Sequence, residues 1–326
     1  MTPMPNITRT PKTEAAYAIK AMQIRSRAAR DLGYFSPFST PPMVIVDHLI
    51  GRKPTVARNT WKQYKNALRS HFQHLANESN ESVAVEELEA AIAALDWEPS
   101  TGTLKHGTRT SATKQKHFKR TDLDKFVGYL GANLGRHKFA NALRTWLLAA
   151  RLTGLRPSEW EYAGLTEIGG RPCLTVRNGK ATNGRANGEF RTLDLSKATV
   201  ADMEALTDMM EMLEGYLREM TFEQLQQCLM HYMKRATRAC FERRKRYPTL
   251  YSLRHQFAAD AKSSGCTQAE VAALLGQATD ETAGRHYARA VSGESAVRVS
   301  PTDADANRVR AKARAYPSRR AQSHRP

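Results

Sequence analysis

Four short segments between residues 153 and 288 carry residue types that could cleave a phosphodiester. They read TGLRPSE at 153–159, YSLRH at 251–255, LLGQ at 274–277 and RHYA at 285–288. The guanidiniums of Arg156 and Arg254 could hold the two non-bridging oxygens of a phosphate, and they keep their charge at neutral pH. The Tyr287 phenol could attack the phosphorus, since two nearby guanidiniums favour its phenolate form. This set predicts cleavage of a phosphodiester through a tyrosine, without a metal ion.

These residues need rigid elements beside them, and hydrophobic periodicity predicts those elements. A helix over 138–152 ends at Gly154, and Pro157 can begin the next helix. Thr121 is expected to cap the helix that opens this part of the chain. Strand-like runs at 174–176 and 190–195 flank a segment rich in Gly and Asn, which predicts a β-hairpin. Further helices are expected at 200–218, 222–242, 252–263, 268–275 and 280–288.

The first hundred residues read as a separate helical bundle. Helices are predicted at 13–32, 43–50, 56–76 and 82–95, the last capped by Ser82. In the third helix, five apolar residues fall on one face: Trp61, Tyr64, Leu68, Phe72 and Leu75. Four basic residues fall on another face: Arg58, Lys62, Lys65 and Arg69. The basic stripe could follow a row of phosphates, or it could be only a solvated charged face.

The fold class expected from these elements is mainly α with a small antiparallel β-sheet. A helical DNA-binding domain (1–97) is expected to precede a catalytic domain (119–295). Residues 98–118 are a basic linker, rich in Gly, Ser and Thr, that could follow a DNA backbone. Its candidate DNA contacts are Lys105, Arg109, Lys114 and Lys116. Residues 296–326 are a basic tail, expected to be extended until something binds it.

The charge of the chain favours a nucleic-acid partner. Fifty Lys and Arg stand against 32 Asp and Glu, which gives a net charge of +18. The basic residues are segregated, because 100–120 and 306–326 carry no acidic residue at all. The four cysteines are far apart and form no CxxC pair, which argues against a disulfide scaffold or a zinc module. With no long apolar segment and no signal core, the expected location is the cytoplasm, on the nucleoid when bound.

In this order and spacing, the segments resemble the tyrosine recombinase (phage integrase) family. The family pattern is TGxRxxE, a lysine on a β-hairpin, HxLRH, LGH and a tyrosine on a following helix. Lys180 matches the hairpin lysine, and the resemblance covers about residues 118–290. The N-terminal part is similar, more loosely, to the family's core-binding domain. Tyr251 and Gln277 depart from the pattern, since histidine is usual at the first position and histidine or tryptophan at the second.

The resemblance implies a site-specific DNA recombinase or integrase, such as mobile genetic elements carry. Its catalytic residues would be Arg156, Lys180, Tyr251, Arg254, Gln277 and Tyr287. Lys180 would protonate the 5′-oxygen leaving group, with Arg177, Arg185 and Lys197 as nearby alternatives. Glu159 would orient Arg156, and His255 would be a buried structural residue. No cofactor and no metal are implied.

The resemblance also implies how the protein would act on DNA. Tyr287 would form a 3′-phosphotyrosine, and a homo-tetramer would exchange strands between two double-stranded DNA recombination sites through a Holliday junction. A partner recombinase or a DNA-bending protein could join this complex, and no membrane is involved. The 296–326 tail would dock on a neighbouring protomer, or remain a disordered polyelectrolyte.

Two other functions stay open from the sequence. Tyr251 is a poor base at neutral pH and Gln277 carries no charge, so each could lose roughly 1–2 kcal/mol of transition-state stabilisation. The protein could therefore be a catalytically weakened DNA-binding protein on a recombinase fold. A type IB topoisomerase, which uses the same chemistry to relax supercoils, is the less favoured alternative.

Overall fold

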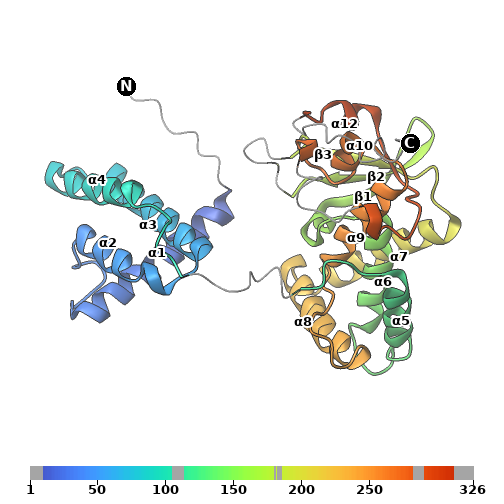
Figure 1. The fold of residues 1–326 in the computed structure, drawn as a ribbon, viewed down its shortest axis with the longest axis horizontal. Coiled ribbons are helices and arrows are strands. Elements are labelled where there is room, and N and C mark those ends of the chain that lie inside the picture. The colour runs from blue at the N-terminus through green and yellow to red at the C-terminus, as the bar shows by residue number, and fades with distance from the viewer. Residues whose placement is uncertain (1–9, 105–113, 180, 182–185, 282–289, 312–326) are drawn as a thin grey trace, which may run out of the picture. The chain divides into compact units, whose positions relative to one another are not determined.

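The computed structural model describes residues 10–104, 114–179, 181, 186–281 and 290–311. The chain divides into two compact units, Met1–Arg109 and Thr110–Pro326 (Figure 1). The first is helical, and the second combines helices with a four-stranded antiparallel sheet. The fold is thus mainly α with a small antiparallel sheet, as the sequence predicts. Across the described ranges, no helix is both long and apolar enough to cross a bilayer.

The first unit is a bundle of four α-helices and one 3₁₀ turn. These are α1 (Pro11–Leu32), α2 (Pro42–Gly51), η1 (Lys53–Thr55), α3 (Arg58–Glu78) and α4 (Ser82–Trp97). Trp61, Leu68 and Phe72 on α3 are fully buried, and Tyr64 and Leu75 pack beside them. The apolar face predicted for this helix therefore forms the core of the bundle. The predicted cap at Ser82 is wrong by one residue, because Glu81 is the N-cap and Ser82 already lies in the helix.

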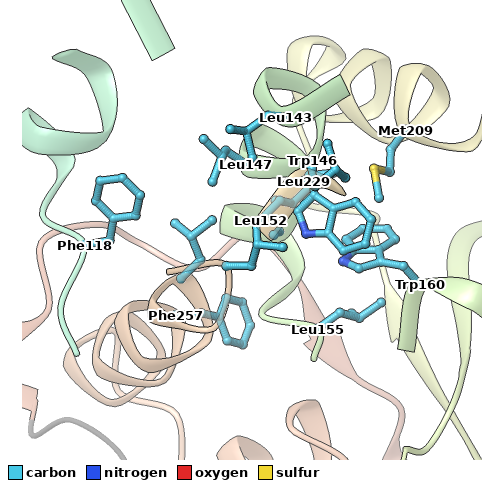
Figure 2. Packing of buried hydrophobic residues seen from close by; sticks show 14 of the residues in the cluster. Phe118, Leu143, Trp146, Leu147, Leu152, Leu155, Trp160, Met209, Leu229 and Phe257 are labelled. Carbon is cyan, nitrogen blue, oxygen red and sulfur yellow. The ribbon is translucent and has the colours of Figure 1, made fainter. Parts of the chain in front are cut away.

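The second unit surrounds one central helix, α6 (Ala140–Thr153). Its other helices are α5 (Arg120–Gly131), η3 (Pro157–Tyr162), α7 (Val200–Leu217), α8 (Phe222–Cys240), α9 (Ser252–Ser263), α10 (Gln268–Leu274), η5 (Ala290–Ser292) and α12 (Asp303–Asn307). Helix α6 packs against α5, α7, α8 and α9, so it is buried on nearly every side. Figure 2 shows its Trp146 beside Trp160 of η3, with ring centroids 6.2 Å apart.

Gly154 ends α6 and determines where the following residues lie. It adopts φ 62°, which favours glycine over every other residue. A Cβ at this position would lie 2.3 Å from Cδ1 of Phe257 on α9, so no side chain fits. The chain turns here directly into Arg156 and η3, as the sequence predicts.

The sheet follows the order β1-β2-β3-β4, with antiparallel neighbours. Its strands are β1 (Ala163–Ile168), β2 (Arg171–Arg177), β3 (Phe190–Asp194) and β4 (Ser300–Pro301). The predicted hairpin is β2–β3, in which Val176 pairs with Arg191. Strand β1 was not predicted from the sequence. Of the helix predicted at 280–288, residues 282–288 lie outside the described part of the chain.

Two expectations about the second unit are wrong. The N-cap of α5 is Lys119 and not Thr121, which lies inside the first turn. Residues 300–311 are not an extended tail, since β4 pairs with β3 and α12 packs on α10. The Asp305 carboxylate accepts the backbone N–H of Thr192 at 2.8 Å, and the Arg310 N–H donates to the Ala278 carbonyl at 3.0 Å. These long-range contacts hold a segment whose composition alone suggested disorder.

Each end of the basic linker forms a backbone hydrogen bond with one unit, the N-terminal end with the first and the C-terminal end with the second. The Leu104 N–H donates to the Val56 carbonyl at 2.9 Å, within the first unit. In the second unit, the Gln115 N–H donates to the Tyr247 carbonyl at 3.1 Å, and the hydroxyl of Ser252 donates to the Gln115 carbonyl at 2.5 Å.

Candidate active site

The Glu159 carboxylate lies at the centre of the candidate site. The residue is 1% exposed and belongs to η3, just after the turn at Gly154. Its Oε2 accepts the backbone N–H of Arg156 at 2.8 Å, so the carboxylate caps its own helix. Its Oε1 accepts the backbone N–H of Gly179 at 3.3 Å, which ties η3 to the residues that follow β2.

The two predicted phosphate-binding arginines meet at this carboxylate. Nη1 of Arg156 forms an ion pair with Oε1 of Glu159, and Nη1 of Arg254 lies 3.4 Å from Oε2. Arg254 is fully buried and also donates to the carbonyls of Gly154 at 3.0 Å and Leu275 at 2.5 Å. The structure thus brings together two motifs that are distant in sequence, in an arrangement fixed by several backbone groups.

A third arginine, Arg191, completes the cluster, and the sequence analysis did not single it out. It has no exposed surface, and its Nη2 lies 2.8 Å from Oε2 of Glu159. A signal was present, because Arg191 alternates with Leu193 and Leu195 and so lies on the inward face of β3. An arginine at an inward strand position needs buried partners, which here are Glu159 and Asn178.

The cluster carries more positive than negative charge. Burial alone would raise the pKa of Glu159, but the guanidiniums of Arg191, Arg254 and Arg156 outweigh it and hold that pKa well below its usual range. Burial lowers the pKa of Arg191, and Glu159 opposes this effect. Three guanidiniums around one carboxylate leave buried positive charge, which an anion such as a phosphate would compensate.

Gln277 lies at the turn after α10, directly after Gly276, which borders Asn178 and Arg191. Its backbone N–H donates to the Ala272 carbonyl at 2.8 Å, and Gly276 before it adopts φ 58°. The residue is 3% exposed, yet neither its amide nitrogen nor its amide oxygen has a hydrogen-bond partner among the described residues. Leaving such a group unsatisfied costs about 1–3 kcal/mol, so a ligand that supplies a partner is favoured.

Tyr251 and His255 lie at the start of α9. Tyr251 is 37% exposed, and its ring meets the His255 ring edge-on with centroids 5.4 Å apart. Burial, together with the charges of Lys116, Arg254 and His117, lowers the pKa of His255 to about 4. His255 is therefore neutral at pH 7 and adds no charge to the site. It is only partly buried, whereas the resemblance implies a buried residue.

Four predicted site residues lie outside the described part of the chain. They are the candidate general acid Lys180, the candidate nucleophile Tyr287, and the linker residues Lys105 and Arg109. Of their neighbours, Gly179 precedes Lys180 and contacts Glu159. The helix α10 and Gln277 lie upstream of Tyr287.

The predicted basic stripe on α3 is only half available to a partner. Arg58 and Lys62 are exposed. Lys65 instead donates to the carbonyls of Asp96 at 3.1 Å and Glu98 at 3.2 Å. Arg69 pairs with the Asp96 carboxylate at 2.8 Å, so these two residues also hold α3 against the end of α4.

A basic loop between α8 and α9 was missed by the sequence analysis. Arg244 anchors it, donating to both oxygens of Asp122 at 2.6 and 2.8 Å and lying 4.2 Å above the Phe241 ring. Arg243, at φ 54°, is a non-glycine residue in the left-handed region. The anchor therefore fixes a strained loop on the surface. The run ERRKRY was visible in the sequence, but its neighbours in space were not.

This loop lies beside two predicted DNA-binding residues. Lys245 and Arg246 are exposed, and the adjacent Tyr247 forms a parallel bridge with Lys114. Lys114 and Lys116 are exposed as well, and the charge of Lys116 reaches His255. The bridge therefore brings exposed basic residues of the loop and of the linker together, and we call Lys114, Lys116, Lys245 and Arg246 the basic strip.

Metal ligands do not gather in the parts of the chain that the structure describes. No group of three or more His, Cys, Asp or Glu side chains there could hold an ion. The cysteines at 173, 228, 240 and 266 are free thiols. Among the described residues, the groups buried together at the candidate site are three guanidiniums, one carboxylate and one amide.

Comparisons with known proteins find likeness in structure and not in sequence. No family model and no curated protein sequence matches the chain. The pre-cleavage complex of the XerH site-specific recombinase with its difH substrate is 16% identical, with a TM-score of 0.48, covering 84% of this chain and 75% of that one. The post-cleavage complex of XerH with palindromic difH is 18% identical, with a TM-score of 0.45, covering 83% and 74%.

The XerA recombinase is 12% identical, with a TM-score of 0.36, covering 83% of this chain and 92% of that one. All three structural neighbours are recombinases.

Proposed function

We propose that the protein is a tyrosine site-specific recombinase, which cuts and rejoins DNA strands through a 3′-phosphotyrosyl intermediate. The observation that carries this proposal is the buried cluster in which Glu159 joins Arg156 and Arg254. These are the two arginines that the family pattern assigns to the scissile phosphate, and the cluster retains an excess of positive charge. Such a cluster suits a singly charged phosphodiester, whose charge increases in the transition state.

The proposed reaction conserves the phosphodiester bond. The Tyr287 oxygen forms a bond to phosphorus while its phenol proton passes to solvent. The P–O5′ bond breaks, its electron pair stays on O5′, and Lys180 gives O5′ a proton. The 5′-hydroxyl of a partner strand then attacks the phosphotyrosine by the reverse steps, so that rejoining needs no nucleotide.

The remaining residues would hold the phosphate in place. Arg156 and Arg254 would donate to its non-bridging oxygens, and the buried amide of Gln277 would donate a further hydrogen bond. Arg254 is fully buried in the free protein, so the atoms that cover it must move when DNA binds. The Tyr251 hydroxyl, half-exposed at the start of α9, could donate to the same phosphate.

The two units would act together on a duplex. The first would contact DNA through Arg58 and Lys62, and the second through the strip that contains Lys114 and Lys116. Strand exchange would follow the resemblance, with a homo-tetramer, two recombination sites and a Holliday junction. Whether the outcome is integration or another rearrangement depends on the arrangement of the sites.

The test is covalent capture on DNA. Nicked duplexes tiled across the DNA that flanks the gene are mixed with the wild type, with Tyr287→Phe, and with Tyr162→Phe. Tyr162 is an exposed tyrosine of the same unit and serves as the matched control. A protein–DNA adduct that survives denaturation, persists in Tyr162→Phe and vanishes in Tyr287→Phe is the expected result. An adduct that persists in Tyr287→Phe would show that another residue is the nucleophile.

A second candidate function is a DNA-binding protein on the same fold that cleaves poorly. The observations that favour it are Tyr251 and Gln277 in place of the usual residues, and the complete burial of Arg254. Tight binding to one DNA site with no adduct would support it. A type IB topoisomerase would instead relax supercoiled DNA without a preferred site.

A further inference from the structure

Arg191 is the second residue of β3, and its side chain has no exposed surface. Each nitrogen of its guanidinium has an acceptor on a different element. Nε donates to the Leu274 carbonyl at the end of α10, at 3.0 Å. Nη2 donates to Glu159 on η3 at 2.8 Å, and Nη1 donates to Oδ1 of Asn178, the first residue after β2. One side chain therefore connects three separate parts of the candidate site.

Asn178 extends this connection to the base of the hairpin. Its Nδ2 donates to the carbonyls of Asn187 at 3.1 Å and Gly188 at 3.0 Å, across the hairpin. The next residue, Gly179, donates its N–H to Glu159 at 3.3 Å. Residues 178 and 179 are thus held from both sides, and Lys180 follows them directly in the chain.

The junction is also sterically tight. A Cβ on Gly276 would lie 2.1 Å from Oδ1 of Asn178 and 2.7 Å from Nη1 of Arg191. The turn after α10, the base of the hairpin and Arg191 therefore fit together in one arrangement. A displacement of any one of them moves the other two.

Stability alone does not account for an arginine here. The inward face of the sheet is otherwise apolar, with Leu174, Val176 and Leu193 buried around position 191. A buried ion pair is often no more stabilising than apolar side chains of the same volume. Arg191 also adds a third positive charge to a cluster that already holds Arg156 and Arg254 around one carboxylate.

We propose that Arg191 is a positioning residue for the leaving-group acid of the cleavage reaction. It holds Asn178 and Gly179 against Glu159, and these are the two residues that immediately precede Lys180 in the chain. The three nitrogens of the Arg191 guanidinium donate to Leu274, Asn178 and Glu159, so Arg191 acts through the start of the hairpin turn. The inference rests on the proposed function, in which Lys180 protonates O5′.

A substrate in which sulfur replaces the bridging O5′ distinguishes this role from general support of the fold. With the normal substrate, the P–O5′ bond breaks and the alkoxide needs a proton from Lys180. When sulfur replaces the bridging O5′, the P–S bond breaks and the electron pair leaves on a thiolate, which needs no proton. A defect in positioning the acid disappears with the sulfur substrate, whereas a defect in phosphate binding or folding remains.

The experiment compares single-turnover cleavage of the oxygen and sulfur substrates by the full chain. The variants are Lys180→Ala, Arg191→Lys and Asn178→Ala. Arg191→Lys keeps the charge but cannot reach three acceptors. Asn178→Ala breaks the link to the hairpin and leaves the Arg191–Glu159 ion pair in place. The control is Arg171→Ala, because Arg171 is an exposed arginine of the same sheet.

A lost general acid lowers the rate by about 10²–10⁴-fold, so Lys180→Ala should lose that much on the oxygen substrate and recover on sulfur. On the oxygen substrate, the cleavage rates of Arg191→Lys and Asn178→Ala should fall at least about tenfold. On the sulfur substrate they should come within about threefold of the wild-type rate, since only protonation is affected. Arg171→Ala should match the wild type on both.

Two outcomes would overturn the inference while the proposed function stands. In the first, Arg191→Lys and Asn178→Ala lose equal activity on both substrates, or all activity, so that Arg191 supports the fold or the phosphate site. In the second, neither variant loses activity on the oxygen substrate. If Lys180→Ala is not recovered by sulfur, Lys180 is not the acid, and both the inference and that step of the proposed function fail. If the wild type cleaves neither substrate, the proposed function itself fails.

Discussion

Replacing Glu159 by glutamine should strongly destabilise the second unit, because Glu159 is the buried partner of three arginines. The substitution keeps the shape of the side chain and removes its charge. Its two oxygens now accept from the guanidiniums of Arg156, Arg191 and Arg254 and from two backbone N–H groups. An amide has only one acceptor oxygen, and its NH₂ group would point donors at other donors.

The size of the effect follows from the burial of the cluster. Removing one partner of a buried ion pair costs about 3–5 kcal/mol, because the remaining charge stays desolvated. For a domain of 150–250 residues, each kcal/mol lowers the melting temperature by about 2–4 °C. We therefore expect Glu159→Gln to lower the melting temperature of the second unit by roughly 6–20 °C.

Calorimetry of the full chain can measure this, because the two compact units can unfold in separate transitions. Only the transition of the second unit should shift. Glu161→Gln is the matched control, since Glu161 lies on the same short helix and is exposed. The depressed pKa of Glu159 stabilises the fold above the unfolded value of about 4.3, and this contribution is lost as the pH falls below it. The difference between wild type and Glu159→Gln should therefore shrink in acid.

A shift of less than about 2 °C for Glu159→Gln, equal to that of Glu161→Gln, would refute this reasoning, since the expected loss is at least 3 kcal/mol. It would mean that solvent, or the backbone carbonyls that Arg191 and Arg254 contact, compensate the positive charge of the guanidiniums. The carboxylate would then not be the centre that holds them.

Gly276→Ala should destabilise the fold by about 1–3 kcal/mol in denaturant titrations, because a Cβ clashes at this positive-φ turn, whereas Gly215→Ala, in open space on α7, should stabilise it by up to about 1 kcal/mol. The stability contribution of His255, whose folded pKa is near 4, should be complete above about pH 6.5 and decline as the pH falls toward 4, and pH-dependent melting of His255→Gln should show a flatter profile. Gln277→His should raise the single-turnover cleavage rate by about tenfold, because a charged donor replaces a neutral one, and an unchanged rate would remove Gln277 from the phosphate site. Arg246→Gln, in the loop after α8, should reduce the salt slope of DNA binding by about 1, and an unchanged slope in filter-binding titrations would exclude a phosphate contact there.

Local rules were enough to predict the elements that present Arg156 and Arg254. The periodic apolar residues of α6 end at a glycine, and Gly154 does end the helix. The hairpin follows from two alternating runs separated by Gly and Asn, and it is β2–β3. These signals lie within a few residues of the feature that they predict, so a single sequence contains them.

Contacts between distant segments could not be predicted in this way. Nothing near Arg191 in the sequence indicates that Glu159 and Leu274 are its partners. Strand β4 has two residues, one of them Pro301, so it carries no alternation to detect. The sequence predicts Thr121 as the cap because a threonine is a usual cap, whereas the N-cap is Lys119. The first N–H of α5, from Arg120, donates instead to the carboxylate of the distant Glu294 at 2.7 Å.

The return of residues 300–311 to the sheet has a consequence for the order in which the chain folds during synthesis. Until this segment leaves the ribosome, β3 has an open edge, the N–H of Thr192 lacks its acceptor, and the stretch that begins at Ala278 lacks its pairing with Arg310. Closing so long a loop is slow, so the second unit should reach its final form only after translation has passed residue 310. A nascent chain would therefore carry both arginine motifs well before the second unit could hold them in their final arrangement.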